Sequence, residues 1–223
     1  DDSNIPDSPT NNFCTMNPLA PSNTGTADFE IGNTSITLGD NEEAFGTFGV
    51  SSGKWYWEVR HLASTSSNNK LGIGIADADN PNNNEQVNYG HQATTWAVGD
   101  IISVAVDVDA ETITFRKNNT AIETNTDWSS KGWTTIVAIL TSANSAGTEF
   151  GMINFGGDSS FAGTVTAQNN SDENGHGDFY YTPPSGYLAL CADNLPEPTI
   201  SPLNDDQPSD HFNTVLYSGT GSS

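Results

Sequence analysis

Apolar and polar residues alternate along several short stretches of the chain, which is the pattern of half-buried β-strands. The clearest case is Gly53–Val59, in which Trp55, Trp57 and Val59 share one face of the expected strand. Each tryptophan can bury on the order of 200 Å². We therefore expect both in the core of a sheet, in preference to an exposed platform on which sugars or bases would stack.

Other stretches with strand-like composition alternate with turn-forming Gly, Asn and Asp residues. The predicted strands are Phe13–Leu19, Thr26–Ile31, Thr34–Leu38, Ala44–Val50, Lys70–Ala76, Asp100–Asp107, Thr112–Lys117, Thr120–Glu123, Trp133–Leu140, Glu149–Phe155 and Phe212–Tyr217. Gly32-Asn33 and Asn118-Asn119 are predicted as two-residue hairpin turns. Gly72 and Gly74 indicate that another backbone or a bulky ring approaches closely. This spacing predicts an antiparallel two-sheet sandwich, with no helix beyond a turn or two.

A long Asn-rich loop is expected at Asp77–Thr95, and loops of this length are often functional. Exposed loop aromatics commonly anchor a ligand or partner, so the candidate contact residues are Tyr89, His91, Asn84 and Gln86. The alternative is that the aromatic residues pack beneath the loop as a small satellite core, and Trp96 is expected to be buried.

The chain divides by composition into four segments. Residues 1–12 form an acidic arm, residues 13–196 the sandwich, and residues 197–210 a Pro-rich acidic linker. Residues 211–223 contain a short strand that begins a further module or serves as a partner-binding tail. The chain does not begin with Met and has no signal peptide, so we expect a processed chain or a fragment.

The charge balance restricts the partners. The 223 residues include 6 Lys+Arg against 28 Asp+Glu, which gives a formal net charge of −22. Such a field repels nucleic acid and anionic membranes, and no basic patch in the sequence offsets it. No stretch reaches the ~18 apolar residues of a membrane-spanning helix. The composition favours solubility and suits a salty or extracellular setting.

The two cysteines, Cys14 and Cys191, flank the predicted core. Domain termini often lie close together, so a disulfide between them is one interpretation. Two reduced, buried thiols are the other interpretation, and the spacing alone leaves both open.

A search for chemistry finds no convincing constellation. Asp107 and Asp109 have the spacing of paired carboxylates, but they lie at a hairpin turn where Asp is favoured by backbone hydrogen bonds. Asp77-x-Asp79 and Asp107-x-Asp109-x-Glu111 both begin like a calcium-binding loop. Neither has the Gly at position 6 or the Glu at position 12 of a helix–loop–helix calcium site. The four His residues are scattered, which disfavours zinc. We therefore expect no catalytic residues, no metal and no cofactor.

Four blocks resemble the SPRY domain family in sequence and in order: Gly53–Val59, Leu71–Asp79, Gly99–Ile122 and Phe150–Gly163. The resemblance covers roughly residues 13–196, and Asn119 departs from the Gly that the family usually has there. It implies a bent, concanavalin-like jelly-roll sandwich that binds partners through loops at one end and has no catalysis of its own. The loop at Asp77–Thr95 would be one of these loops.

The ending GYLALCADNLPEPTI, followed by FNTVLYSGTGSS, resembles SPRY-containing bacteriophage virion proteins. That resemblance implies a virion surface protein, either a capsid decoration or a fibre module. Its partners would be other virion subunits, including copies of itself, and a host-surface glycan or protein. The alternatives are a secreted or cell-surface carbohydrate-binding adhesin and an intracellular SPRY adaptor that recognises peptides. An enzyme is the weakest alternative.

Overall fold

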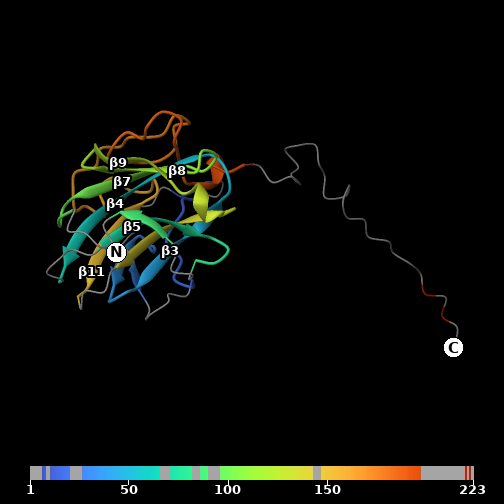
Figure 1. Ribbon diagram of the computed structural model, residues 1–223, viewed down its shortest axis with the longest axis horizontal. Coiled ribbons are helices and arrows are strands. Elements are labelled where there is room, and N and C mark those ends of the chain that lie inside the picture. Colours follow the sequence, from blue (N-terminus) through green and yellow to red (C-terminus); the bar gives the residue numbers. More distant parts are fainter. Residues whose placement is uncertain are drawn as a thin grey trace.

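The structure, a computed structural model, describes residues 7–8, 11–20, 27–65, 71–81, 86–89, 96–142, 147–196, 219 and 221. Two β-sheets pack face to face in this part of the chain, and neighbouring strands are antiparallel apart from one two-residue strand (Figure 1). The predicted fold class, an antiparallel two-sheet sandwich, is therefore confirmed. None of the described helices is long and apolar enough to cross a membrane.

The larger sheet has eight strands. Seven of them lie side by side in the spatial order β1 (Asp28–Glu30), β2 (Ser35–Leu38), β11 (Glu149–Asn154), β4 (Lys54–Ser64), β7 (Ile101–Asp107), β8 (Thr112–Lys117) and β9 (Thr120–Asp127). β12 (Leu188–Ala189) pairs in parallel with the start of β4, where β11 has already ended. β4 is therefore a central strand, and its pairing continues through His61–Ser64, which the sequence places in a loop.

The smaller sheet has four strands. Their spatial order is β3 (Glu43–Val50), β10 (Ile136–Ser142), β5 (Leu71–Asp77) and β6 (Gln86–Tyr89). β6 forms inside the stretch predicted as a long loop. Two short 3₁₀ turns, η1 (Ser129–Lys131) and η2 (Ala192–Asn194), are the helical elements of the described residues.

The tryptophans of β4 lie between the two sheets. Trp55 is 3% exposed and Trp57 is 1% exposed, and the Trp57 ring lies 6.0 Å from that of Phe155. Val59, on the same face of the strand, is also buried. The prediction that both tryptophans belong to the core is confirmed, because alternate residues of a central strand all point at the opposing sheet.

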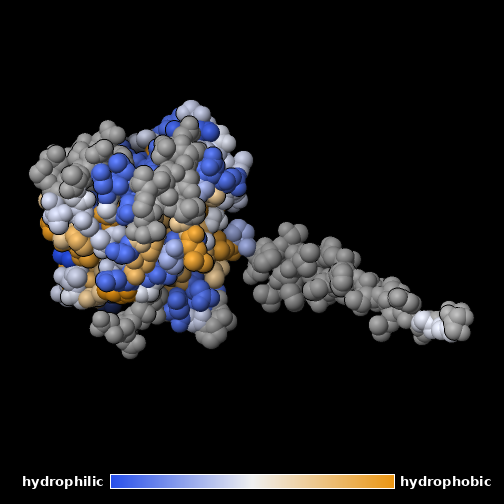
Figure 2. All heavy atoms as spheres, turned by 90° about the horizontal axis from the view of Figure 1, so that it is seen from below, coloured by the Kyte–Doolittle hydropathy of each residue, from blue (hydrophilic) through white to orange (hydrophobic). Residues whose placement is uncertain are grey.

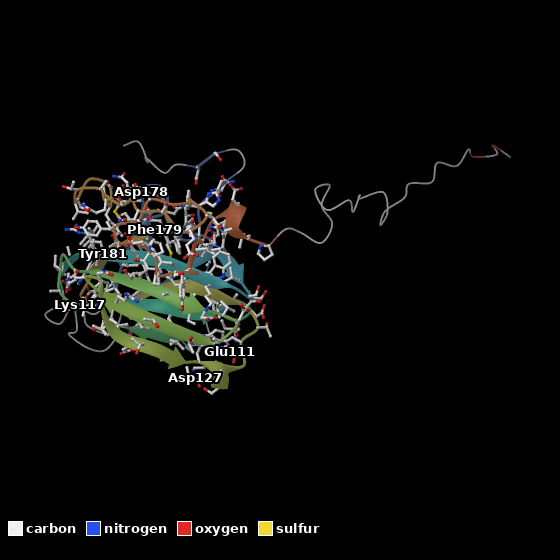
Figure 3. The ribbon with its side chains drawn as sticks, turned by 90° about the horizontal axis from the view of Figure 1, so that it is seen from above. Glu111, Lys117, Asp127, Asp178, Phe179 and Tyr181 are labelled. Atoms are coloured by element: carbon white, nitrogen blue, oxygen red, sulfur yellow. The ribbon has the colours of Figure 1, made fainter. Side chains whose placement is uncertain are left out.

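Residues 156–192, here called the cap, cover the outer face of the larger sheet. Figure 3 shows the cap residues Asp178, Phe179 and Tyr181 on one side of the body and the β9 residue Asp127 at the other. Phe179 packs edge-on against Tyr56 of β4, with ring centroids 5.0 Å apart. The larger sheet is thus buried on both faces at its centre.

The boundaries of the four predicted segments stay predictions. The linker and the strand predicted at Phe212–Tyr217 lie outside the described residues. The strand predicted at Phe13–Leu19 is reduced to two isolated bridges, one of which joins Met16 to Gly46 of β3. Pro18, within this stretch, restricts the backbone and has no N–H to donate to a ladder.

Hydrophilic and hydrophobic residues share the described surface of the body (Figure 2). Large apolar side chains that remain exposed there are Leu19, Ile31 and Val98. Single exposed hydrophobic residues are ordinary. Ile31 differs because it lies at the mouth of a groove.

Candidate functional site: a groove between the cap and the first hairpin

A groove of about 440 Å³ opens between the cap, β11 and the β1–β2 turn. Its walls include Phe13 from the N-terminal segment, Ile31 and Thr34 from the turn, residues 152–155 of β11 and its end, and the loop 157–163. A volume of this size is typical of cavities that hold a small ligand or a large side chain. Four separate parts of the chain therefore meet at one surface hollow.

The loop 157–163 is shaped by the carboxylate of Asp158. Its Oδ1 accepts hydrogen bonds from the N–H and O–H of Ser160 at 2.8 and 2.6 Å, and Oδ2 accepts from the Ala162 N–H at 2.7 Å. Asn154 Oδ1 accepts from the Asp158 N–H at 3.1 Å. Asp and Asn favour turns because their side chains bond to nearby backbone groups. The loop is thus fixed by its own side chains before any ligand arrives.

Both walls of the groove contain residues in the left-handed backbone region. The φ angles are 50° at Ile31, 48° at Phe161 and 53° at Ala162. For residues with a Cβ this region costs roughly 1–2 kcal/mol each, and it is a marked outlier for a β-branched residue. Backbone strain of this kind clusters at ligand clamps and functional sites. The strain therefore marks the groove as the candidate site.

The turn that carries Ile31 is longer than predicted. The hairpin of β1 and β2 is confirmed, but Ile31, Gly32 and Asn33 all have positive φ, at 50°, 62° and 64°. The Thr34 N–H then reaches back to the Glu30 carbonyl oxygen at 3.2 Å. A two-residue Gly-Asn turn would have left Ile31 in the strand, whereas the wider turn places it at the groove.

Polar side-chain atoms on the groove walls already have partners. Thr34 Oγ1 donates to the Ile31 carbonyl oxygen at 2.7 Å. Ser160 Oγ accepts from the Gly163 N–H at 2.9 Å, and Asn154 Nδ2 donates to a backbone carbonyl of the cap at 2.8 Å. These polar side chains are therefore engaged within the protein, and the apolar residues Phe13, Ile31 and Phe161 line the groove beside them.

Cys14 lines the groove, but its side chain is buried in the main core and is not reactive. The side chain is 2% exposed, and its Sγ lies 3.5 Å from Thr47 Oγ1. Burial raises the pKa of this thiol to about 11. Because the thiolate is the nucleophilic form, Cys14 stays neutral and inert near neutral pH.

Both cysteines are free, so the disulfide interpretation of Cys14 and Cys191 does not hold. Phe13 forms a bridge with Cys191, and the next residue, Cys14, points to the opposite side of the chain. Cys14 joins the main core between the sheets, while Cys191 packs among the residues under the cap. The two thiols therefore lie in different layers.

Glu58 holds the cap, and with it the groove loop, onto the sheet. Its carboxylate is fully buried and accepts hydrogen bonds from the Tyr56 hydroxyl at 2.9 Å and from the N–H groups of Tyr180 and Tyr181 at 2.8 and 2.7 Å. Burial raises its pKa to about 7, although the donors favour the charged form. Its position under the cap assigns it a structural role.

The predicted contact residue Tyr89 is buried, at 9% exposure, and stacks on Phe115 with ring centroids 5.7 Å apart. Trp96 is 2% exposed and donates its Nε1–H to the Leu71 carbonyl oxygen at 2.8 Å. The alternative in which loop aromatics pack inward therefore describes both residues. Tyr89 is not the exposed anchor that the sequence suggested, because β6 carries its ring into the main core.

Of the other predicted contact residues, Gln86 belongs to the part of the chain that the structure describes. Its side-chain amide donates to Glu43 of β3. His91 and Asn84 lie outside the described residues. A ligand-binding role for Gln86, His91 and Asn84 stays a prediction. Among the residues that the structure describes, no three of His, Cys, Asp and Glu come together as a metal site.

The groove residues were not identified from the sequence. The strain at Ile31, Phe161 and Ala162 arises from tertiary packing, and residue type alone gives no sign of it. The available signal was the small-residue stretch GGDSSFAG, which indicates an irregular, tightly turned segment. That signal predicts a turn but not the hollow beside it.

Comparison with solved structures finds similar folds, of which a SPRY domain is an example. The SPRY domain of human HERC1 aligns with a TM-score of 0.46 and 19% sequence identity, over 62% of this chain and 96% of that chain. No family model and no curated protein matches the chain. The two-sheet architecture itself rests on the strand pairing described above.

Proposed function

We propose that the chain is a non-enzymatic binding module whose groove receives an apolar side chain of a protein partner. The observation that carries the proposal is the groove itself, with strained residues on both walls. The thiol of the lining residue Cys14 is buried and has a raised pKa, and the carboxylate on the groove wall, that of Asp158, is engaged in shaping the loop. These features support binding over chemistry.

The hydrogen-bonding groups of the groove suit an apolar side chain of a protein partner better than a sugar. A carbohydrate brings many hydroxyl groups, and burying a hydroxyl without a hydrogen bond is costly. The wall groups Thr34, Asn154 and Ser160 are already paired inside the protein. An aromatic or aliphatic side chain needs no such partners, and large apolar anchors in pockets carry most of the affinity at many protein interfaces.

The groove can be tested with a single substitution at its mouth. Ile31→Asn removes apolar wall but suits the left-handed backbone, since Asn tolerates positive φ. We expect N-acetyltryptophanamide, used as a probe in NMR titrations, to shift amide signals of the 157–163 loop in the parent chain. We expect these shifts to weaken by about tenfold in Ile31→Asn, while the melting temperature stays equal or rises.

Val98→Asn is the matched control, because Val98 is an exposed apolar residue that does not line the groove. It should leave the titration unchanged. A probe that shifts no loop signals, or that binds Ile31→Asn as well as the parent, would contradict the groove as an apolar binding site. Methyl glycosides that bind there with higher affinity than the tryptophan probe would favour the carbohydrate-binding alternative.

The biological setting we propose is the surface of a bacteriophage virion, as a capsid decoration or a fibre module. The support is the resemblance of the C-terminal stretch, GYLALCADNLPEPTI followed by FNTVLYSGTGSS, to SPRY-containing virion proteins, together with the net charge of −22. Its partners would be other virion subunits, including copies of itself, and a host-surface protein or glycan. An intracellular SPRY adaptor that recognises peptides is the alternative closest to the apolar groove.

Mass spectrometry of purified virions tests this setting directly. We expect peptides of the chain in the particle at the copy number of a structural protein. Absence from every particle preparation would exclude the virion role and leave the adhesin and adaptor alternatives. Glycan-array binding that His91→Ala abolishes would then support the secreted or cell-surface adhesin.

A further inference from the structure

The sandwich has four sheet edges, and three of them are short or covered. β1 is three residues long and β6 is four residues long. β3 is paired by the N-terminal segment: the Thr47 N–H donates to the Thr15 carbonyl at 2.8 Å, and the Asn17 N–H to the Phe45 carbonyl at 2.7 Å. Natural sheets commonly protect their edges in these two ways.

The fourth edge, β9, is long and open. It runs for eight residues beside β8, and no other strand or bridge of the described residues pairs with it. Thr120, Ala121, Glu123 and Thr124 are exposed. Figure 1 shows β9 at the margin of the labelled strands of its sheet. The register of its pairing with β8 shifts between Ile113 and Phe115 and again between Phe115 and Arg116, so β9 is not a regular strand along its whole length. The outward backbone groups of its regular parts can still pair with an incoming strand.

One apolar residue on β9 is incompletely covered. Ile122 packs against the main core but remains half-buried, because β9 has a neighbour on one side only. An added strand would extend the sheet and cover this side chain. The edge also carries Glu123 and Asp127, which disfavour an acidic incoming strand.

The chain itself contains a segment that fits this edge. Phe212–Tyr217, with sequence FNTVLY, has the residue types of a strand and no charged side chain. The stretch from Pro196 to Pro208 contains four prolines, and Pro-rich sequences favour extended, semi-rigid chains. At ~3.1 Å per residue, the 15 residues 197–211 would place the segment roughly 45 Å from the end of the described sandwich.

We propose that Phe212–Tyr217 of a neighbouring copy of this chain adds a strand to the free edge of β9. The Pro-rich composition of the linker favours an extended chain, which would present the segment to the next molecule. Main-chain hydrogen bonds supply the affinity of such strand addition, and alternate side chains supply its specificity. The arrangement is head-to-tail, so it generates rings or filaments according to whether the rotation closes.

The full chain tests the proposal through its self-association. Sedimentation velocity over a wide concentration range should show reversible oligomers, and hydrogen exchange should show the amides of residues 120–127 becoming protected as they form. Leu216→Pro removes a donor from the incoming strand and restricts its backbone, so association should weaken about tenfold or more. Residue 216 lies outside the described sandwich, so we expect an unchanged melting temperature.

Ser218→Pro is the matched control, since it places a proline just beyond the segment, and its association should equal that of the parent. Ile122→Lys introduces an inward-pointing charge at the receiving edge and should also abolish association, whereas Thr120→Lys at the end of β9 should not. A synthetic peptide of residues 210–218 separates the two halves of the contact. It should bind the Leu216→Pro variant, whose receiving edge is unchanged, but not the Ile122→Lys variant.

Three results would overturn the proposal. The chain could remain monomeric at every concentration with its β9 amides unprotected. Its association could be unaffected by Leu216→Pro. Alternatively, β9 could be protected in the monomer in a manner that Leu216→Pro removes, which would mean that each molecule binds its own segment. If strand addition at β9 is disproved, the proposed binding function of the groove is unaffected, because Ile31 and β9 lie at opposite edges of the larger sheet's strand order.

Discussion

The carboxylate of Glu58 is fully buried beneath the cap, and its pKa is raised by that burial to about 7 from an ordinary value of 4.5. The folded state therefore binds this proton more readily than the unfolded state between these two values. Stability from the group is fully present below about pH 4.5 and is lost as pH rises through 7. The shift corresponds to about 3 kcal/mol in the free energy of unfolding.

The prediction is a fall in the free energy of unfolding between pH 5 and pH 8 that depends on Glu58. Chemical denaturation at a series of pH values should show it. Glu58→Gln cannot ionise, so its profile should be flatter over this window, although loss of an acceptor facing the Tyr180 N–H lowers its stability throughout. Glu123→Gln, at an exposed position on β9, should retain the parent slope. Equal slopes in all three proteins would contradict the assignment.

The two thiols provide a second test at the residue scale. Burial raises the pKa of both Cys14 and Cys191, that of Cys14 to about 11. At pH 8 the native protein should react with iodoacetamide about a hundredfold more slowly than the denatured protein, because little thiolate is present and access is blocked. Mass spectrometry of the alkylated chain resolves the two sites. Rapid modification of Cys14 in the native state would show that the groove opens to its back wall.

At the scale of elements, the close packing of β5 against β6 requires a residue without a side chain at Gly74. A Cβ on Gly74 would lie 1.9 Å from the Val87 carbonyl oxygen and 2.7 Å from Asn88 Cα. Gly74→Ala should therefore lower the free energy of unfolding by about 3 kcal/mol or more, as overpacking against backbone does. Gly46→Ala is the control, since its nearest contact is 3.4 Å, and it should cost less than about 1 kcal/mol. Similar denaturation midpoints for the two variants would contradict the close approach.

How far the sequence predicts an element depends on whether the signal is local. Alternation placed the tryptophan strand correctly, and Asn118-Asn119 was correctly predicted as a turn with positive φ at both residues, at 47° and 65°. Pairing partners act at a distance, so β6 was missed inside a polar loop. The groove forms where segments that are distant in the sequence meet, and no local pattern encodes it. The candidate site was therefore much less predictable than the sandwich that forms it.

At the scale of the whole molecule, charge opposes compactness. The whole chain has a net charge of −22 and 6 basic residues, of which Lys54 and Lys117 pair with Asp107 and Asp100 at 2.7 and 3.8 Å. The remaining acidic groups repel one another across the surface. Self-repulsion of this kind destabilises the folded state while keeping the protein soluble. Salt should relieve it, since the Debye length falls from about 30 Å at 0.01 M to about 8 Å at 0.15 M.

We expect the free energy of unfolding at pH 7 to rise with NaCl over that range by on the order of 1 kcal/mol, or roughly 2–4 °C in Tm. The control is pH rather than a variant. Near the sequence pI of about 4.1 the net charge vanishes, so the same addition of salt should leave Tm almost unchanged. Differential scanning calorimetry at the two pH values makes the comparison. An equal salt effect at both would mean that NaCl acts through specific ion binding or hydration, and that repulsion among the acidic residues is not what limits the stability of the sandwich.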